Sequence, residues 1–281
     1  MANAVKGGAS NLAIRLGTAA VSVPVILGLL FRGPPWGFYA LVLPASLIGA
    51  YELFGMTHPT DRPSRILGVL LSAAASLAIF FYGDNVKVVF TILLAIPLLG
   101  PLVTLVRLGD ISTAALRACA MGFGPLFVAV PIALLGVMRR DMGNAVGAGY
   151  VLLAIGFAWL ADTGGYFAGR FLGKHKLYEA VSPKKTIEGA IGGLTGGVVW
   201  ALVAHFWFLP ELSLAHGVPL AIVAAALGQA GDLGESLLKR STGVKDSGTI
   251  VPGHGGILDR IDALIMTSAI VFLYTLWFRG S

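Results

Sequence analysis

Long apolar runs with very few charges dominate this 281-residue sequence and restrict it to one structural class. An α-helix needs about 20 mostly apolar residues to cross a bilayer, and nine stretches have that character. Charged residues make up 12% of the chain, against about 25% in soluble domains. We therefore predict an all-α, polytopic membrane protein with about nine transmembrane helices, not a soluble globule, a disordered chain or a nucleic-acid-binding module. The predicted spans are 12–31, 36–56, 66–82, 87–106, 114–138, 146–169, 189–209, 218–238 and 258–278.

Basic residues predict the orientation of these spans, because cytoplasmic loops carry an excess of Lys and Arg. With a cytoplasmic N-terminus, 15 of the 20 basic residues fall on the cytoplasmic side and five on the other. The weakest point is Arg139–Arg140, which this topology puts in an outer loop. The first span follows Lys6 and lacks a clear small-residue cleavage site, so we expect it to be retained rather than removed as a signal peptide.

Acidic residues divide the chain into two unlike parts. Nine of the 14 acids lie in residues 151–281, several of them inside or at the ends of spans. We therefore expect residues 1–145 to form a transmembrane scaffold of spans 1–5. Residues 146–281 would form the catalytic region, with spans 6–9 and cytoplasmic loops 170–189 and 239–257. A transporter with midplane carboxylates is the alternative class, but it would show a repeat between the halves, and none is present.

Five acids in or next to spans are functional candidates, since a carboxylate within a span costs roughly 2.5–3.5 kcal/mol on insertion scales. Asp162 lies near the end of the sixth span, Asp232 and Glu235 lie in the eighth, and Asp259 and Asp262 open the ninth. The predicted topology places all five toward the cytoplasm. Asp259 and Asp262 are spaced i, i+3 and would share a helical face. Carboxylates from two helices would suit Mg²⁺.

Buried ion pairs are the alternative role for the same acids. Glu235 and Lys239 are spaced i, i+4, and Asp259 is followed directly by Arg260. Asp262 would also be favoured near a helix N-terminus by the helix dipole. Lys239 is expected to mark the membrane surface, which puts Asp232 roughly 10 Å further along the helix.

Two predicted cytoplasmic loops place basic and glycine residues beside these acids. In loop 170–189, Lys184 and Lys185 are placed to bind phosphate oxygens, whereas Ser182–Pro183 is equally typical of a helix start. Loop 239–260 is rich in glycine, which lets backbone N–H groups approach an anion. Its Gly255–Gly256 pair leads into the ninth span, where a helix N-terminus favours phosphate.

Other residues of the sequence carry weaker signals. His254 has no second His or Cys at ligand spacing, so it is a phosphate donor or an ordinary loop residue rather than a zinc ligand. The only cysteine, Cys119, excludes an internal disulfide. The run GAIGGLTGG at 189–197 contains three overlapping GxxxG patterns, which predict close helix packing, with a homodimer interface as one use.

At this point the second half resembles a known family. The Ser, Lys-Arg, Lys-Asp, His-Gly-Gly, Asp-Arg and final Asp positions of residues 236–262 match, in spacing, the signature of the CTP:phosphatidate cytidylyltransferases, or CDP-diacylglycerol synthases. DTGGYFAGRFLGK and SPKKTIEG also resemble family motifs, so the resemblance covers about 155–275. Gly165 and Val251 depart mildly from the residues usual in the family, and neither departure touches a charged position.

The resemblance implies a nucleotidyl transfer from CTP to phosphatidate that yields CDP-diacylglycerol and pyrophosphate at the cytoplasmic face of the inner membrane. It also implies Mg²⁺, with K⁺ as a candidate second cation, held by Asp232 and Asp259. The lipid phosphate would itself attack, because a phosphate monoester is largely ionised at pH 7 (second pKa about 6), so no protein nucleophile is required.

The remaining site residues are assigned by charge and position. Lys184, Lys185, Lys239 and Arg240 would neutralise phosphates of CTP or lipid. Lys245, His254 and Arg260 would hold pyrophosphate, Asp162 and Asp246 would orient cations or lysines, and Ser182, Gly255 and Gly256 would contact substrate. A different lipid acceptor, such as an ether-lipid phosphate or a polyprenol, stays open. A CDP-alcohol phosphotransferase is disfavoured because its DG…AR…G…D…D pattern is missing.

Overall fold

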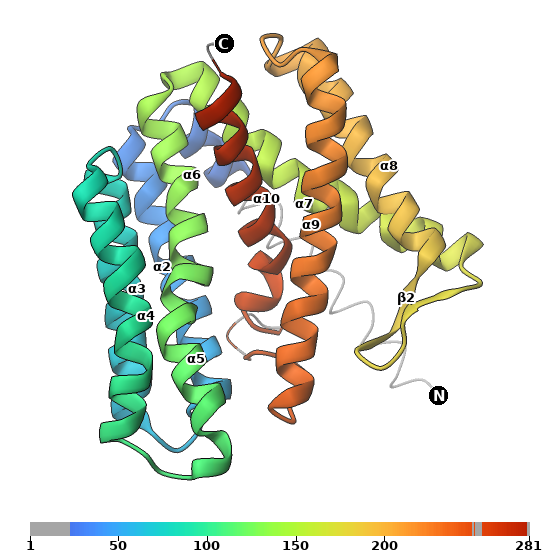
Figure 1. The fold of residues 1–281 in the computed structure, drawn as a ribbon. Helices are drawn as coiled ribbons and strands as arrows, with labels where there is room; N and C mark the ends of the chain where they lie inside the picture. Colours follow the sequence, from blue (N-terminus) through green and yellow to red (C-terminus); the bar gives the residue numbers. More distant parts are fainter. Residues whose placement is uncertain (1–22, 249, 251–254, 280–281) are drawn as a thin grey trace, which may run out of the picture.

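The computed structural model describes residues 23–248, 250 and 255–279, and these are almost entirely helical. Two groups of helices lie on either side of α10 (Figure 1). The N-terminal group contains α2 (Pro35–Thr57), α3 (Arg62–Tyr82), α4 (Val86–Val106), η1 (Ile111–Thr113), α5 (Ala114–Gly124), η2 (Pro125–Ala129) and α6 (Val130–Asp141). The C-terminal group contains α7 (Asn144–Leu172), β1 (Lys176–Tyr178), β2 (Ser182–Thr186), α8 (Ile187–Val203), η3 (Ala204–Phe208) and α9 (Leu214–Ser241), and α10 spans Leu258–Phe278.

Eight helical segments within the described residues are long and apolar enough to cross a membrane, and the protein is an integral membrane protein. They match predicted spans two to nine within a few residues, with α5, η2 and α6 joined as one crossing over Ile111–Asp141. Most of the predicted first span, 12–31, lies outside the described residues, although residues 23–31 are helical. The length of the apolar runs was therefore sufficient to predict the helices of this fold.

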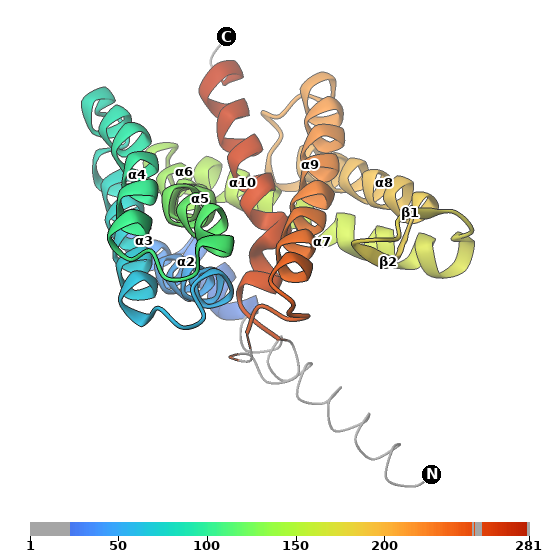
Figure 2. The same cartoon turned by 60° about the horizontal axis from the view of Figure 1, so that its bottom comes forward.

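Helix α10 connects the two groups, because it packs against α9 and α7 on one side and against α6 and α2 on the other. Figure 2 shows it running between the α2–α6 bundle and α9. The largest core cluster follows the same route, with Val128 and Ile132 from the first group, Phe157 from α7 and Ile265 from α10. The start of α10 is consequently placed where residues from both halves of the chain can reach it.

Glycines let α7 and α8 pack backbone against backbone. A Cβ atom on Gly192 would lie 2.7 Å from the carbonyl oxygen of Gly164, and one on Gly193 would lie 3.0 Å from that of Ala161. The first distance is too short for any residue but glycine without a shift, and the second would require the neighbour to give by a few tenths of an ångström. The close packing predicted from GAIGGLTGG is confirmed, and it is used inside one chain. A homodimer stays a prediction, but the GxxxG patterns no longer support it because these glycines already pack against α7 or α9.

Loop 170–189 contains more regular structure than we predicted. Arg170 lies in the last turn of α7, and residues 176–186 form an antiparallel hairpin of β1 and β2. Ser182 begins β2 and does not start a helix, so that interpretation was wrong. The N-cap of α8 is Thr186, whose Oγ1 accepts a hydrogen bond from the Gly189 amide at 3.1 Å. Thr186 is a standard capping residue, and the Pro after Ser182 misled the prediction.

Arg139 is not in an outer loop, as the predicted topology had it. It lies in the last turn of α6, is 1% exposed, and donates to the carbonyl oxygens of Leu30 and Gly33 and to Oδ1 of Asn144. A buried guanidinium needs many acceptors, and backbone carbonyls at the end of a helix provide them. Arg139 thus joins α6 to the segment before α2 rather than reporting on topology.

Candidate active site

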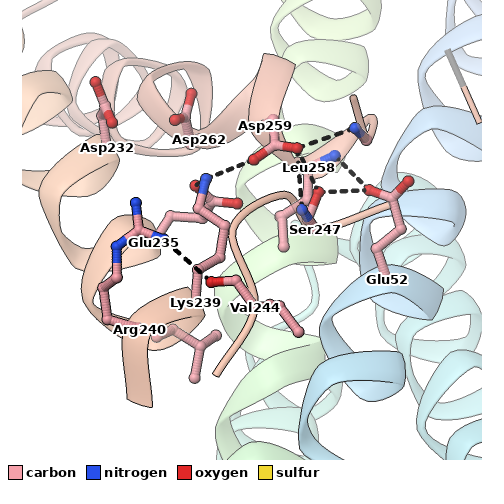
Figure 3. A network of polar contacts seen from close by, with 12 residues as sticks. Glu52, Asp232, Glu235, Lys239, Arg240, Val244, Ser247, Leu258, Asp259 and Asp262 are labelled. Carbon is pink, nitrogen blue, oxygen red and sulfur yellow. Dashed lines mark hydrogen bonds and ion pairs between the residues drawn. The ribbon is translucent and has the colours of Figure 1, made fainter. Parts of the chain in front are cut away.

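Lys239 on α9 lies between two carboxylates. Its Nζ is 2.5 Å from Oε2 of Glu235, one turn earlier on α9, and 2.5 Å from Oδ1 of Asp259 on α10. The three side chains are only 10%, 2% and 9% exposed (Figure 3). The i, i+4 pair of Glu235 and Lys239 is confirmed. The second carboxylate, from α10, buries Lys239 in the protein, and its place at the membrane surface stays a prediction.

Asp259 is held by backbone and side-chain donors as well as by Lys239. Its Oδ2 accepts hydrogen bonds from the Ser247 amide at 3.1 Å, the Ser247 hydroxyl at 2.9 Å and the Gly256 amide at 2.9 Å. The Gly256 amide, which we predicted to face substrate, is thus already donated within the protein. Asp259 turns back toward the residues before α10, so one of its carboxylate oxygens satisfies the backbone N–H groups of Ser247 and Gly256.

Glu52 on α2 belongs to the same network and was missed from the sequence. It is 4% exposed and accepts hydrogen bonds from the Ser247 hydroxyl at 3.1 Å, the Ile257 amide at 3.1 Å and the Leu258 amide at 2.8 Å. The available signal was an acid inside the second predicted span, in the run GAYELFGM. Such an acid is a functional candidate by the same rule that identified the other five.

A second acidic cluster lies beside the first and combines α7, α9 and α10. Asp232 forms an ion pair with Lys185 of β2 at 2.6 Å. Asp162 and Asp262 are within electrostatic reach of Asp232. Figure 3 shows Asp262 between Asp232 and Asp259. The shared helical face of Asp259 and Asp262 stays a prediction, and both acids reach α9, Asp259 through its ion pair with Lys239 and Asp262 through its electrostatic interaction with Asp232 and Glu235.

Two hollows adjoin these clusters. A hollow of about 420 Å³ contains charged residues of both signs, namely Asp162, Arg170, Lys184, Lys185 and Asp232. An apolar groove of about 680 Å³ separates α4 and α5 from α9 and α10, and Glu235 is its only charged lining residue. Cys119, Gly122 and Phe123 line one wall of the groove, and Gly231, Gly234 and Leu238 line the other. The site thus offers a polar compartment and an apolar one.

The other predicted site residues lie around this centre. Arg240 is exposed at the end of α9, where its guanidinium donates to the Val244 carbonyl at 3.1 Å. Gly255 has a φ of +82°, a conformation that favours glycine. Lys184, Lys245, Asp246 and Arg260 are exposed, and Ser182 is half-buried. His254 lies outside the described residues.

Comparison with known proteins places this arrangement in a family. A family model for cytidylyltransferases matches residues 13–278. The chain belongs to the cytidylyltransferase family. Three similar proteins are the phosphatidate cytidylyltransferases of Staphylococcus haemolyticus (strain JCSC1435), Staphylococcus saprophyticus subsp. saprophyticus and Staphylococcus aureus (strain COL), at 49%, 44% and 45% identity over 131 residues. Each alignment covers 47% of this chain, and the chain spans about half the length of the curated relatives it matches.

The acids of this chain have the right chemistry for a hard divalent cation, although two of them are paired with lysines. The ammonium group of Lys185 forms an ion pair with Asp232, and that of Lys239 forms one with Asp259. Among the described residues, no group of three or more His, Cys, Asp or Glu side chains is arranged to hold a metal ion. Oxygen ligands of this kind nevertheless suit Mg²⁺, and the two lysine ammonium groups show that each carboxylate attracts a cation.

Charge balance supports the same conclusion. Six acidic side chains gather at the start of α10, and only Lys185 and Lys239 form ion pairs with them among the described residues. The six are Glu52, Asp162, Asp232, Glu235, Asp259 and Asp262. Glu52 and Glu235 are buried, and a carboxylate removed from water is costly unless cations or hydrogen bonds compensate it. The site therefore fits a cation-binding role.

Proposed function

We propose that this protein is an integral membrane nucleotidyltransferase that converts CTP and phosphatidate to CDP-diacylglycerol and pyrophosphate in phospholipid synthesis. One observation carries the proposal. In a chain of the cytidylyltransferase family, acids and lysines from α7, β2, α9 and α10 meet between a charged hollow and an apolar groove. A nucleotide and a lipid would thus approach the same residues from two sides.

The reaction we propose is an in-line transfer at phosphorus. A phosphate oxygen of the lipid attacks the α-phosphorus of CTP, a new P–O bond forms, and the bond to the β-phosphate breaks so that pyrophosphate leaves. The lipid phosphate is largely ionised at pH 7, with a second pKa of about 6, so the protein needs to position and neutralise charge rather than supply a base.

The basic residues divide this work by position. Lys184 and Lys185 line the charged hollow and would contact phosphates of the nucleotide or lipid as point charges. Lys239 would do so once it is released from one of its two carboxylates. Arg240, Lys245 and Arg260, at the exposed rim, would bind pyrophosphate before it leaves.

We further propose that Asp232 and Asp259 hold Mg²⁺, with K⁺ as a candidate second cation. The metal would supply neutralisation of the negative charge on the reacting phosphates. Asp162 and Asp262 add carboxylate oxygens on the side of Asp232, and Asp246 lies at the rim near Asp259. A metal would displace Lys185 from Asp232 and Lys239 from Asp259. Lys239 would then still be held by its second partner, Glu235.

The lipid chains would lie in the apolar groove between α5 and α9. Its lining is almost wholly apolar, and its volume of about 680 Å³ falls within the usual range of ligand sites, roughly 300–1,000 Å³. The charged end would face the cytoplasm of a bacterial inner membrane, as the distribution of Lys and Arg predicts. Labelling of a Glu179→Cys variant, in a Cys119→Ser background, tests this side because Glu179 is exposed in the β1–β2 turn.

The decisive assay is CTP-dependent release of pyrophosphate in detergent with phosphatidate and Mg²⁺. We expect activity in the wild type, its loss in Asp232→Asn and Asp259→Asn, and its retention in Asp84→Asn, whose exposed side chain lies in the distant α3–α4 turn. Diacylglycerol and a polyprenol phosphate replace phosphatidate in parallel reactions. Activity in both aspartate variants would refute the metal assignment, and turnover of polyprenol phosphate alone would refute the lipid assignment.

A further inference from the structure

We propose that Glu52 of α2 is a positioning residue that fixes Ser247, Ile257 and Leu258, and through them Asp259, for cytidylyl transfer. This inference rests on the proposed function and extends it, because it gives the N-terminal half a part in the reaction. Figure 3 shows Glu52 reaching from α2 to the start of α10, on the opposite side of Asp259 from Lys239.

The first argument is the number of donors that one carboxylate serves. Oε1 of Glu52 accepts from the Ile257 amide, and Oε2 accepts from the Leu258 amide and the Ser247 hydroxyl. Ile257, the N-cap residue of α10, provides no side-chain cap of its own. A helix 200 residues away in sequence thus supplies the acceptors that the first turn of α10 lacks.

The second argument is the direct connection from Glu52 to Asp259. The hydroxyl of Ser247 lies 3.1 Å from Oε2 of Glu52 and 2.9 Å from Oδ2 of Asp259. A hydroxyl carries one proton, so it donates to one of these carboxylates at a time. Any movement of Glu52 therefore changes the hydrogen bonding of Asp259.

Gly248 and Gly256 pack closely against the side chain of Glu52. A Cβ atom on Gly256 would lie 2.5 Å from Oε2 of Glu52, and one on Gly248 would lie 2.7 Å from Cδ of the same residue. At either distance the Glu52 carboxylate would have to shift to admit a side chain. These two glycines let the loop backbone approach the glutamate, which is a different use from the anion binding that we predicted for this glycine-rich loop.

The third argument is cost. The described residues give Glu52 no Lys or Arg partner within ion-pair distance, although it is 4% exposed. A Ser, Thr, Asp or Asn at position 257 would cap α10 without burying such a carboxylate. A local cap, however, would connect neither α2 nor Ser247 to Asp259. The arrangement is therefore explained by the position it gives to Asp259, not by helix capping alone.

The test compares Glu52→Gln with a matched variant of the same helix. The amide has the same size but keeps one acceptor oxygen and turns an NH₂ group toward N–H or O–H donors. We expect kcat to fall by about 10–100-fold, as for other residues that orient a ligand-binding group, with little change in the KM for phosphatidate. Ser46→Ala is the control, since Ser46 is fully buried on α2 and bonds only to the Leu43 carbonyl of its own helix.

Ser247→Ala and the double variant show whether Glu52 acts through Ser247. If it does, the double variant loses little more activity than Glu52→Gln alone. Additive losses of the two variants would overturn this route. Equal losses in Glu52→Gln and Ser46→Ala that follow the amount of folded protein would overturn the positioning role altogether.

Hydrogen exchange provides a readout that does not depend on activity. We expect the amides of Ile257 and Leu258 to exchange faster in Glu52→Gln than in the wild type, and at unchanged rates in Ser46→Ala. Unchanged amide exchange in Glu52→Gln would overturn the positioning role of Glu52 even if activity fell. If the wild type released no pyrophosphate, the proposed function would fail while faster exchange would still support the contact that Glu52 makes.

Discussion

Lys239 shares one ammonium group between two buried carboxylates, so the change in stability should depend on which of the three residues is replaced. Lys239→Met leaves Glu235 and Asp259, at 2% and 9% exposure, without their cation. Removing one partner of a buried ion pair costs about 3–5 kcal/mol, and because two acids lose their partner here we expect about 5 kcal/mol of destabilisation.

Glu235→Gln should have a much smaller effect on stability. It leaves the Lys239–Asp259 pair with balanced charge, and neither oxygen of Glu235 makes a hydrogen bond beyond its contact with Lys239. We expect a change in stability of less than about 1 kcal/mol, of either sign. In the double variant, Glu235→Gln should recover part of the stability that Lys239→Met loses, because only one unpaired acid remains.

Unfolding followed by tryptophan fluorescence in mixed micelles measures these differences. Because the cluster is largely buried, the difference between the two single variants should change little between low and high salt. Equal destabilisation by Glu235→Gln and Lys239→Met would refute the argument from charge balance. A difference that disappears in salt would show that water reaches the cluster.

Three further predictions use other parts of the structure. His58, at the end of α2, is 2% exposed, and its burial lowers its pKa from 6.5 to about 4. The unfolded chain therefore binds a proton below pH 6.5 that the folded chain does not. Stability should fall by about 2 kcal/mol from pH 7 to pH 5, and His58→Gln should remove this loss when unfolding is measured at both pH values. Gly234 lines the apolar groove, and a Cβ atom there meets open space. Gly234→Leu should therefore fold but turn over long-chain phosphatidate poorly relative to dioctanoyl phosphatidate, and equal losses for both lipids would contradict the groove assignment. Gly192→Leu should destabilise the protein by at least about 1–3 kcal/mol because it forces α7 and α8 apart, while Gly234→Ala, measured by the same unfolding assay, should cost nothing.

The helices could be predicted from sequence because a single physical rule decides them. A span needs a certain length of apolar side chains, and each crossing in the described residues satisfies that requirement locally. The hairpin at 176–186 could not be predicted in the same way, because it depends on pairing between β1 and β2. It also depends on Glu188, which accepts hydrogen bonds from the Lys174 and His175 amides just before β1.

The acids could be selected from sequence, but their partners could not. The Glu235–Lys239 pair follows from spacing along one helix, whereas the contact of Lys239 with Asp259 joins two helices. The Ser247–Glu52 bond spans 195 residues and crosses the predicted boundary between residues 1–145 and 146–281. That division into scaffold and catalytic region stays a prediction, and Glu52 is the residue that argues most directly against treating the first half as inert.

The glycine contact between α7 and α8 also has a consequence for how substrates reach the reaction centre. Two helices that touch through their backbones have few side chains between them that could change rotamer to open a passage. We therefore expect α7, α8 and the β1–β2 hairpin beside them to move as one rigid body. We expect any opening toward the bilayer at the apolar groove between α5 and α9 instead, whose lining includes side chains that can change rotamer, such as Phe123 and Leu238.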